Sequence, residues 1–257
     1  MRVVRYQLKD ETPSYGWILE DKVGAIEGDV FGDFRRLEAE TPLSTVRLLA
    51  PAQPSKIVCI GRNYAEHAKE QNVEPPKVPL LFMKPPSAII NPGEPIELPP
   101  QSQQVEHEGE LVAVIGRRGR NLTTDEAQGI LFGYTVGNDV TARDLQHSDG
   151  QWTRAKGFDT FCPFGPWIDT DFDPSDALIT VRVSGQPRQL ASTRDMIFNV
   201  RTLIAFISSV MTLEPGDLIF TGTPAGVSPL KPGDTVEVDI EGLGRLSNPV
   251  AAGRSQP

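Results

Sequence analysis

The chain has 257 residues, of which 39% are hydrophobic, and its 34 acidic and 25 basic residues give it a formal net charge of −9. This length and composition can support one large domain, or a large domain with a small partner, around a substantial core. The acidic balance and the lack of a long basic run argue against binding to nucleic acid, and no apolar run approaches the ~20 residues of a membrane span.

The use of glycine, proline and cysteine indicates a β-rich protein of the cytoplasm. The 23 glycines and 23 prolines favour many short strands joined by turns over a helical bundle. The N-terminus lacks the apolar core of a secretory signal. The two cysteines, Cys59 and Cys162, have no metal-type spacing, so we expect buried free thiols in a cytoplasmic protein.

Residues 1–50 predict a small β unit. Val3–Tyr6, Tyr15–Glu20 and Val23–Glu27 have the composition of strands, and a tight turn joins the last two. A proline-containing linker follows, and a larger domain is expected over residues 55–250. Since the first unit contains no catalytic grouping, we expect it to support packing or dimer formation.

The first chemical signal of the larger domain is the sequence GRNYAEHAKE, which follows a short predicted strand. Asn63 and Glu66 have the spacing of a capping box, so we predict a short helix from Tyr64. His67 and Glu70 then lie on one face of that helix. A carboxylate beside an imidazole can form a general base, although the same spacing also occurs in ordinary surface helices.

Acidic residues and then a buried strand occupy Val105–Ile115, which reads VEHEGELVAVI. Glu106, Glu108 and Glu110 alternate, and alternate side chains of a β-strand share one face. Three like charges at the mouth of a buried strand repel one another unless a cation neutralises them. Ligands that offer only oxygen suit Mg²⁺, Mn²⁺ or Ca²⁺, so the pattern predicts either such a site or a solvated acidic strand end.

Other charged residues follow neighbouring predicted strands. Asp139 ends a strand at Tyr134–Val140 and becomes a third metal ligand if the two strand ends lie side by side; alternatively, it caps the segment from Thr141. Lys84 ends another strand and faces either solvent or the site. Lys156 lies in a run of cations and aromatic residues that fits the wall of a pocket for an anionic substrate, or aromatic packing alone.

The rest of the sequence mainly predicts helices and strands that belong to the core. A helix is expected over 124–131, capped by Thr123 or Thr124, and a second helix with 3.6-residue apolar periodicity is expected after Asn199. The glycine-rich turn TGTPAGV can offer N–H groups and a threonine hydroxyl to a carboxylate. The strands expected in this part are Ala177–Val183, Pro187–Leu190, Leu218–Phe220, Pro232–Asp239 and Leu243–Leu246.

Six motifs in this order resemble those of the fumarylacetoacetate hydrolase family. They are GRNYAEHAKE (61–70), LLFMKP (80–85), HEGEL (107–111), NDVTARDLQ (138–146), AKGFDTFCPFGPW (155–167) and GDLIFTGTPAGV (216–227). They extend over the full catalytic domain, about residues 55–250. The resemblance implies an α+β, mainly β fold, namely a mixed β-sandwich roll behind a small N-terminal β domain, and a homodimer.

The resemblance also implies which residues form the site. The ligands it implies for a divalent metal, normally Mg²⁺ with Mn²⁺ or Ca²⁺ as alternatives, are Glu108, Glu110 and Asp139. The catalytic residues it implies are His67, Glu70 and Lys156. The substrate-binding residues it implies are Lys84, Arg143, Gln146 and Thr223. Glu106 is left as a spectator or a supporting neighbour.

These parts predict an enzyme that acts on a small anionic 2-oxo or diketo acid. A divalent ion can bind such an acid and stabilise the enolate that forms when a neighbouring C–C bond breaks. Because the dyad can activate water, hydrolysis of an acylpyruvate or related diketo acid is placed first. The alternatives are 2-hydroxyhepta-2,4-diene-1,7-dioate isomerase or oxaloacetate decarboxylase, in aromatic-compound or 2-oxo-acid catabolism. A metal-stabilised binding domain without turnover ranks last.

Overall fold

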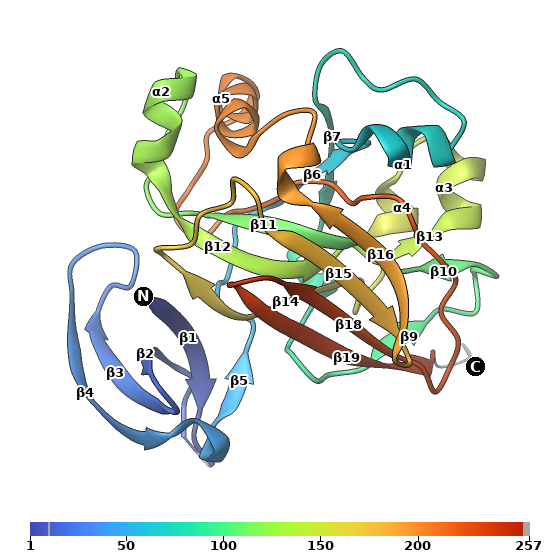
Figure 1. The fold of residues 1–257 in the computed structure, drawn as a ribbon. Coiled ribbons are helices and arrows are strands. Elements are labelled where there is room, and N and C mark those ends of the chain that lie inside the picture. Colours follow the sequence, from blue (N-terminus) through green and yellow to red (C-terminus); the bar gives the residue numbers. More distant parts are fainter. Residues whose placement is uncertain (10, 254–257) are drawn as a thin grey trace.

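The computed structural model describes residues 1–9 and 11–253, and β-sheet dominates the fold (Figure 1). Within these residues the largest sheet has twelve strands, and its main path runs β4-β3-β2-β1-β14-β12-β11-β17-β6-β7, with β5 beside β1 and β8 beside β14. Its strands are β1 (Arg2–Gln7), β2 (Ser14–Leu19), β3 (Lys22–Gly28), β4 (Phe34–Pro42), β5 (Arg47–Leu49), β6 (Ile57–Gly61), β7 (Leu80–Lys84), β8 (Ile89–Ile90), β11 (Gly109–Ile115), β12 (Leu131–Asn138), β14 (Cys162–Asp169) and β17 (Leu218–Phe220).

A second, five-stranded sheet packs against the middle of the first. Its order is β16-β15-β18-β19-β9, and a separate two-stranded ribbon pairs β10 with β13. The bounds are β9 (Ile96–Leu98), β10 (Val105–Glu106), β13 (Thr141–Ala142), β15 (Leu178–Val183), β16 (Gln186–Ser192), β18 (Thr235–Ile240) and β19 (Gly244–Ala252). Buried aliphatic residues of β11, such as Leu111, share one core with Val181 of β15 and Val238 of β18. The mixed, mainly β sandwich predicted from the family resemblance is therefore confirmed.

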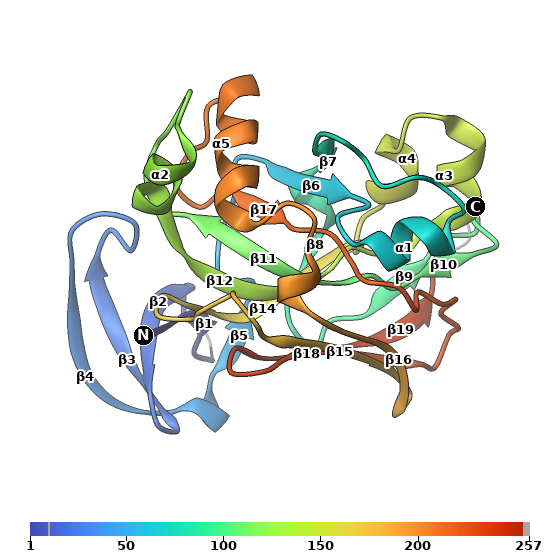
Figure 2. The same ribbon diagram turned by 45° about the horizontal axis from the view of Figure 1, so that its top comes forward.

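The α-helices are short, namely α1 (Ala65–Glu70), α2 (Thr124–Ala127), α3 (Arg143–Asp149), α4 (Thr153–Lys156) and α5 (Val200–Val210). They form two groups, α2 with α5 and α1 with α3 and α4 (Figures 1 and 2). Helix α2 packs against α5, and α3 packs against α4. Within the described ranges, no helix combines the length and the apolar character needed to cross a membrane.

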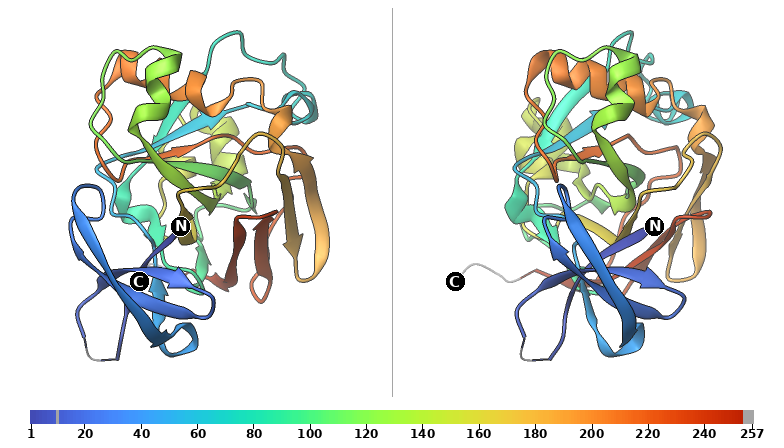
Figure 3. Two further views of the ribbon diagram at one scale, coloured as in Figure 1. Left: turned by 60° about the vertical axis from the view of Figure 1, so that its left-hand side comes forward. Right: turned by 90° about the vertical axis from the view of Figure 1, so that its left-hand side faces the viewer.

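The first five strands group together at one end of the molecule, as the two views of Figure 3 show. They contain the three predicted strands, and Val4, Tyr6 and Val23 form a small core of their own. Strand β1 also pairs antiparallel with β14, so this unit continues the large sheet. The sequence prediction missed β4, because its residues FRRLEAETP are highly charged and none of them is buried.

Two local predictions need correction or refinement. The predicted capping box of Asn63 and Glu66 is wrong, since Tyr64 is the N-cap of α1 and caps it without a side-chain hydrogen bond. The Asn63 amide instead donates to the carbonyls of Phe198 and Thr221 at 3.0 and 2.7 Å, because this buried side chain joins two loops. The helix predicted over 124–131 ends at Ala127 and continues as a 3₁₀ turn to residue 130.

The acidic stretch Val105–Ile115 is not one continuous strand. It is divided into β10 and β11, and His107 and Glu108 lie in the break between them. This break matters for the site, because the side chains of Glu106, before the break, and Glu110, after it, need not point to the same face of one strand.

Candidate metal centre

Two adjacent antiparallel strands bring three carboxylates to one edge of the large sheet. Strands β11 and β12 pair with Gly109 opposite Asn138, so Glu108 precedes β11 and Asp139 follows β12 at the same edge. The Glu108 N–H donates to Asn138 Oδ1 at 2.9 Å, and the Asp139 N–H donates to the Glu108 carbonyl at 2.8 Å. One carboxylate oxygen each of Glu108, Glu110 and Asp139 lies within 4.8 Å of the others.

Two glycines make this arrangement sterically feasible. A Cβ on Gly109 would lie 2.3 Å from Val181 Cγ2, so only glycine lets β11 approach the second sheet this closely. Gly222 has a φ of +98°, a conformation that favours glycine. Its N–H donates to Glu110 Oε2 at 2.8 Å and fixes that carboxylate.

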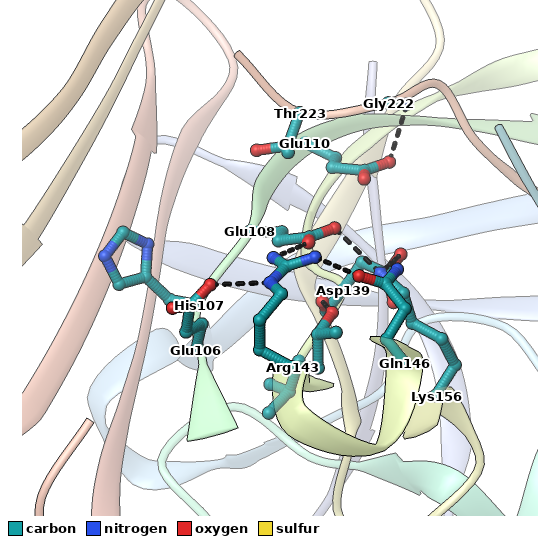
Figure 4. A network of polar contacts seen from close by, with 12 residues as sticks. Glu106, His107, Glu108, Glu110, Asp139, Arg143, Gln146, Lys156, Gly222 and Thr223 are labelled. Carbon is teal, nitrogen blue, oxygen red and sulfur yellow. Dashed lines mark hydrogen bonds and ion pairs between the residues drawn. The ribbon is translucent and has the colours of Figure 1, made fainter. Parts of the chain in front are cut away.

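Glu106 lies outside the carboxylate cluster. It accepts hydrogen bonds from Arg143 Nε at 2.7 Å and from Gln104 Nε2 at 2.6 Å. Figure 4 shows Arg143 between Glu106 and Glu108, with a bond to each. Because the strand is broken after Glu106, the three glutamates do not share one face as the sequence alone suggested.

Two buried lysines balance the charge of the cluster. Lys156 Nζ donates to Glu108 Oε2 at 2.8 Å and to Asp139 Oδ2 at 2.7 Å. Lys84 Nζ lies 2.7 Å from Asp139 Oδ1. Both lysines are only 1% exposed, and such burial is tolerated only where the charge is paired.

Among residues 1–9 and 11–253, Asp139 Oδ1 has no hydrogen-bond donor, although it is buried beside a lysine. The three N–H bonds of Lys84 are directed at the carbonyls of Val140, Lys156 and Phe161, at 2.8–2.9 Å. The contact between Lys84 and Asp139 is therefore an ion pair without a hydrogen bond. An oxygen-only donor set with one buried orphan oxygen fits a hard divalent cation such as Mg²⁺, Mn²⁺ or Ca²⁺.

The protonation of the cluster follows from burial and from its lysines. Burial alone would raise the pKa of Glu108, but Lys156 and Arg143 outweigh it and hold this pKa well below its usual range. Burial, reinforced by Asp139 and Glu108, raises the pKa of Glu110 well above its usual range. Burial opposes the charged form of Lys156, yet Asp139 and Glu108 together raise its pKa.

The predicted dyad is formed and belongs to helix α1. His67 Nδ1 lies 3.0 Å from Glu70 Oε2, and the Gly226 N–H donates to Glu70 Oε1 at 3.0 Å. Burial would raise the pKa of Glu70, but these hydrogen bonds from His67 and Gly226 lower it below its usual value.

His67 of helix α1 and Glu108 of the carboxylate cluster border the same small cavity. His67 and Gln71 line it together with Glu108, Lys156, Gln146 and Thr223. Its free volume is about 10 Å³, close to the space of a single water molecule. His67 is 3% exposed, so a substrate can enter only if helix α1, which carries His67, moves.

The predicted substrate-binding residues surround this cavity or the carboxylates. Arg143 donates to Glu108 and to Gln146 Oε1, and all of these side chains are buried. The Thr223 hydroxyl donates to the Gly109 carbonyl at 3.0 Å. Lys84 lies beneath Asp139 and does not line the cavity itself.

Sequence reasoning missed the buried amide of Gln189, which supports the site from the second sheet. Its Oε1 accepts from the Gly109 N–H at 3.0 Å and contacts His107 Nδ1 at 3.1 Å. Its Nε2 donates to Thr223 Oγ1 at 2.7 Å. Burial lowers the pKa of His107 to about 4, so this neutral histidine is part of the framework. The only feature of the sequence that could have indicated this role of Gln189 was its place as a polar residue on the inward face of a predicted strand.

Sequence reasoning also missed Arg62 and Gln71, which line the cavity; Trp152, which lines it as well, begins the run of cations and aromatic residues that the sequence analysis interprets as a possible pocket wall. Arg62 Nε donates to Gln71 Oε1 at 3.1 Å, and Gln71 Nε2 lies 2.9 Å from His67 Nε2. Polar residues of these types are common at helix ends, so composition gave no reason to single them out.

Comparisons with known proteins agree with this architecture. A family model described as fumarylacetoacetate (FAA) hydrolase C-terminal matches residues 56–251, and one described as Rv2993c-like, N-terminal matches residues 1–51. The mitochondrial oxaloacetate tautomerase fahd2 of Xenopus laevis is 46% identical over 220 residues, which cover 80% of this chain and 69% of that protein.

Two solved structures with different named activities share the fold. The crystal structure of 2-hydroxyhepta-2,4-diene-1,7-dioate isomerase from Mycobacterium marinum gives a TM-score of 0.92 at 45% identity, covering 99% of this chain and 100% of that one. The maleylpyruvate hydrolase from Sphingobium sp. SYK-6, in complex with manganese(II) ion and pyruvate, gives a TM-score of 0.81 at 30% identity, with the same coverage.

The first prediction tests which carboxylates hold a metal. Asp139→Asn removes one ligand charge and should weaken Mn²⁺ binding by more than the ~10–100-fold typical of residues that only orient a ligand. Glu106→Gln is the matched control, because Glu106 lies in the same acidic stretch but pairs with Arg143; its effect should stay within that range. Calorimetric titration of both variants with Mn²⁺ checks this, and a larger loss in Glu106→Gln would contradict the assignment.

The second prediction concerns the pH dependence of metal binding. The raised pKa of Glu110 means that the metal-free protein holds a proton there, and a bound cation must displace it. Metal affinity should therefore rise with pH and level off once the pH exceeds this pKa. Titrations with Mn²⁺ in two buffers of different ionisation enthalpy should reveal proton release wherever the affinity still rises with pH, and binding without proton release in that range would be inconsistent with a protonated Glu110.

Proposed function

The chain belongs to the fumarylacetoacetate hydrolase family, and on this premise we propose that it is a divalent-metal-dependent enzyme that hydrolyses a C–C bond in an acylpyruvate or a related diketo acid. The observation that carries the proposal is that one small cavity is lined both by His67, which is paired with Glu70, and by Glu108 of the carboxylate cluster. A general base on one side and an electrophilic centre on the other are the two components that this hydrolysis needs.

The cluster would hold Mg²⁺, with Mn²⁺ or Ca²⁺ as alternatives, through Glu108, Glu110 and Asp139. When bound, the ion would supply the Lewis acidity that polarises a 2-oxo group and favours an enolate. Lys156 would add a fixed positive charge beside the same oxygen, because its ammonium lies between Glu108 and Asp139. The hydroxyl of Thr223 and the amide of Gln146 would orient the substrate from the cavity wall.

The dyad would activate water. His67 Nε2 would take a proton from water, and Glu70, bound to Nδ1, would stabilise the imidazolium that results. The oxygen of that water adds to the acyl carbon, and the bond from this carbon to C3 of the pyruvate part breaks. The acyl group leaves as a carboxylic acid, and the pyruvate enolate takes up a proton at C3.

Proton transfer without bond cleavage is the second candidate function. The relatives named as an isomerase and as a tautomerase are 45% and 46% identical to this chain, whereas the hydrolase is 30% identical. In such a reaction His67 would move a proton between two carbons, or between carbon and oxygen, of a 2-hydroxydiene-dioate or of oxaloacetate. Oxaloacetate decarboxylation needs the same enolate and no attacking water, so it is a further alternative.

The expected homodimer, the cytoplasmic location and the division into residues 1–50 and 55–250 stay predictions.

The third prediction separates the work of the dyad from that of the carboxylates. His67→Gln should leave the affinities for Mn²⁺ and oxalate nearly intact, because the imidazole is bonded to Glu70 and Gln71 and, among the described residues, makes no hydrogen bond to the cluster. Acylpyruvate hydrolysis should fall by ~10²–10⁴-fold, the usual contribution of a general base, and oxaloacetate decarboxylation should fall less. The measurement is kcat for both substrates beside the oxalate Kd.

The control for this experiment is His147→Gln, which changes an exposed histidine of α3 and should alter neither rate. An equal loss of both reactions in His67→Gln, with oxalate still bound, would argue against selective water activation. Turnover of a hydroxydiene-dioate by the wild-type protein, with none of acylpyruvates, would favour the isomerase instead.

A further inference from the structure

A chain of side-chain contacts leads from Arg62 to the dyad. Arg62 Nε donates to Gln71 Oε1 at 3.1 Å, and Gln71 Nε2 lies 2.9 Å from His67 Nε2. On the other side of the ring, His67 Nδ1 lies 3.0 Å from Glu70 Oε2. Both nitrogens of the imidazole are therefore engaged, one by a carboxylate and one by an amide.

The chemistry of these groups decides which nitrogen carries the proton. The guanidinium of Arg62 can only donate, so the atom of Gln71 that faces it must be the amide oxygen. The atom that faces His67 is then the amide nitrogen, which can only donate. His67 Nε2 must accept this hydrogen bond, and its ring proton must be on Nδ1, where the carboxylate of Glu70 can accept it.

Gln71 adds a constraint that Glu70 does not provide. A carboxylate at Nδ1 is compatible both with the neutral Nδ1–H tautomer and with an imidazolium protonated on both nitrogens. An imidazolium would place its Nε2–H against the N–H₂ of Gln71, two donors facing each other. Only the neutral tautomer, with the lone pair of Nε2 free to accept, satisfies every contact.

Arg62 is itself held in an uncommon conformation. Its φ is +58°, in the left-handed region that residues other than glycine seldom adopt. Its guanidinium lies 5.7 Å from the ring centroid of Trp152, which packs edge-on against Phe82. The surrounding aromatic residues thus support the position from which Arg62 orients the amide.

We propose that Gln71, oriented by Arg62, is a positioning residue that keeps Nε2 of His67 unprotonated, so that the ring stays in the neutral Nδ1–H form set by Glu70 and presents the Nε2 lone pair to the cavity. The inference rests on the proposed function for its purpose, since a general base must accept its proton at Nε2. In the closed cavity the Gln71 amide occupies that lone pair, and it yields to a water or a substrate proton when a ligand enters.

The direct test is the ring ¹⁵N spectrum of His67 in ¹⁵N-histidine-labelled protein. The chain has three histidines, so the signals of His67 are assigned by their loss in His67→Gln. The wild-type protein should show Nδ1 protonated and Nε2 unprotonated. Gln71→Leu should give a mixture of the neutral Nδ1–H form and the imidazolium, because Glu70 still requires a proton on Nδ1, and Gln71→Glu, which offers an acceptor, should give a ring protonated on both nitrogens.

A matched control is available in Gln128→Leu. Gln128 Oε1 accepts from Arg201 Nε at 3.2 Å, the same type of contact on the exposed surface of another part of the fold. This variant should leave the His67 spectrum unchanged. Retained Mn²⁺ affinity in every variant shows that each is folded, and Gln71→Glu is nearly isosteric with the wild type.

Turnover gives an independent readout. Gln71→Leu should lower kcat by about 10–100-fold, as for other residues that orient a reacting imidazole, with little change in the oxalate Kd. A wild-type His67 protonated at Nε2, or His67 spectra that are identical in both Gln71 variants, would overturn the inference. If the spectra are as expected but no acylpyruvate is hydrolysed, the positioning role stands and the proposed function fails.

Discussion

Three carboxylates are buried within 4.8 Å of one another, and the organisation of the site depends on how their charge is balanced. In a region with little water, like charges at this distance cannot all remain ionised without cations beside them. The two lysines and Arg143 balance part of this charge, and the raised pKa of Glu110 shows that the balance is incomplete in the metal-free protein. A divalent ion would complete the charge balance of the three carboxylates and would also supply the Lewis acid that the proposed reaction needs.

The fold creates this position by bringing two sheets and several loops into close contact. Gly109 lets β11 approach β15, and Gln189 joins the break before β11 to the loop that carries Thr223. The three N–H groups of Lys84 donate to backbone carbonyls of three different segments, and these bonds fix its charge next to Asp139. Among the described residues, the nearest Asp139 oxygen has no hydrogen-bond donor. The residues that hold the carboxylates are thus also those that join the layers.

Local patterns predicted the main components of this arrangement, because they express periods and strand ends. The acidic residues before an apolar strand and Asp139 after another strand indicated a shared edge, and the periodicity after Asn199 indicated helix α5. The break at His107 and Glu108 could not be predicted, because the contacts that stabilise it come from Gln189, about eighty residues away. The contacts of Asn63 and Gln71 could not be predicted for the same reason. Asn63 contacts a distant loop and does not form the local capping box, and the position of the Gln71 amide depends on Arg62, on the other side of α1.

We propose that Glu108, Glu110 and Asp139, and not Glu106, would hold the metal of this protein. A crystal structure of the protein with Mn²⁺ and oxalate, in which the anomalous signal locates the ion, tests this proposal most directly. We expect one ion bound by an oxygen of each of these three carboxylates, with Glu106 still paired to Arg143. An ion bound elsewhere, or one that includes Glu106 and leaves Asp139 on its lysines, would contradict the account.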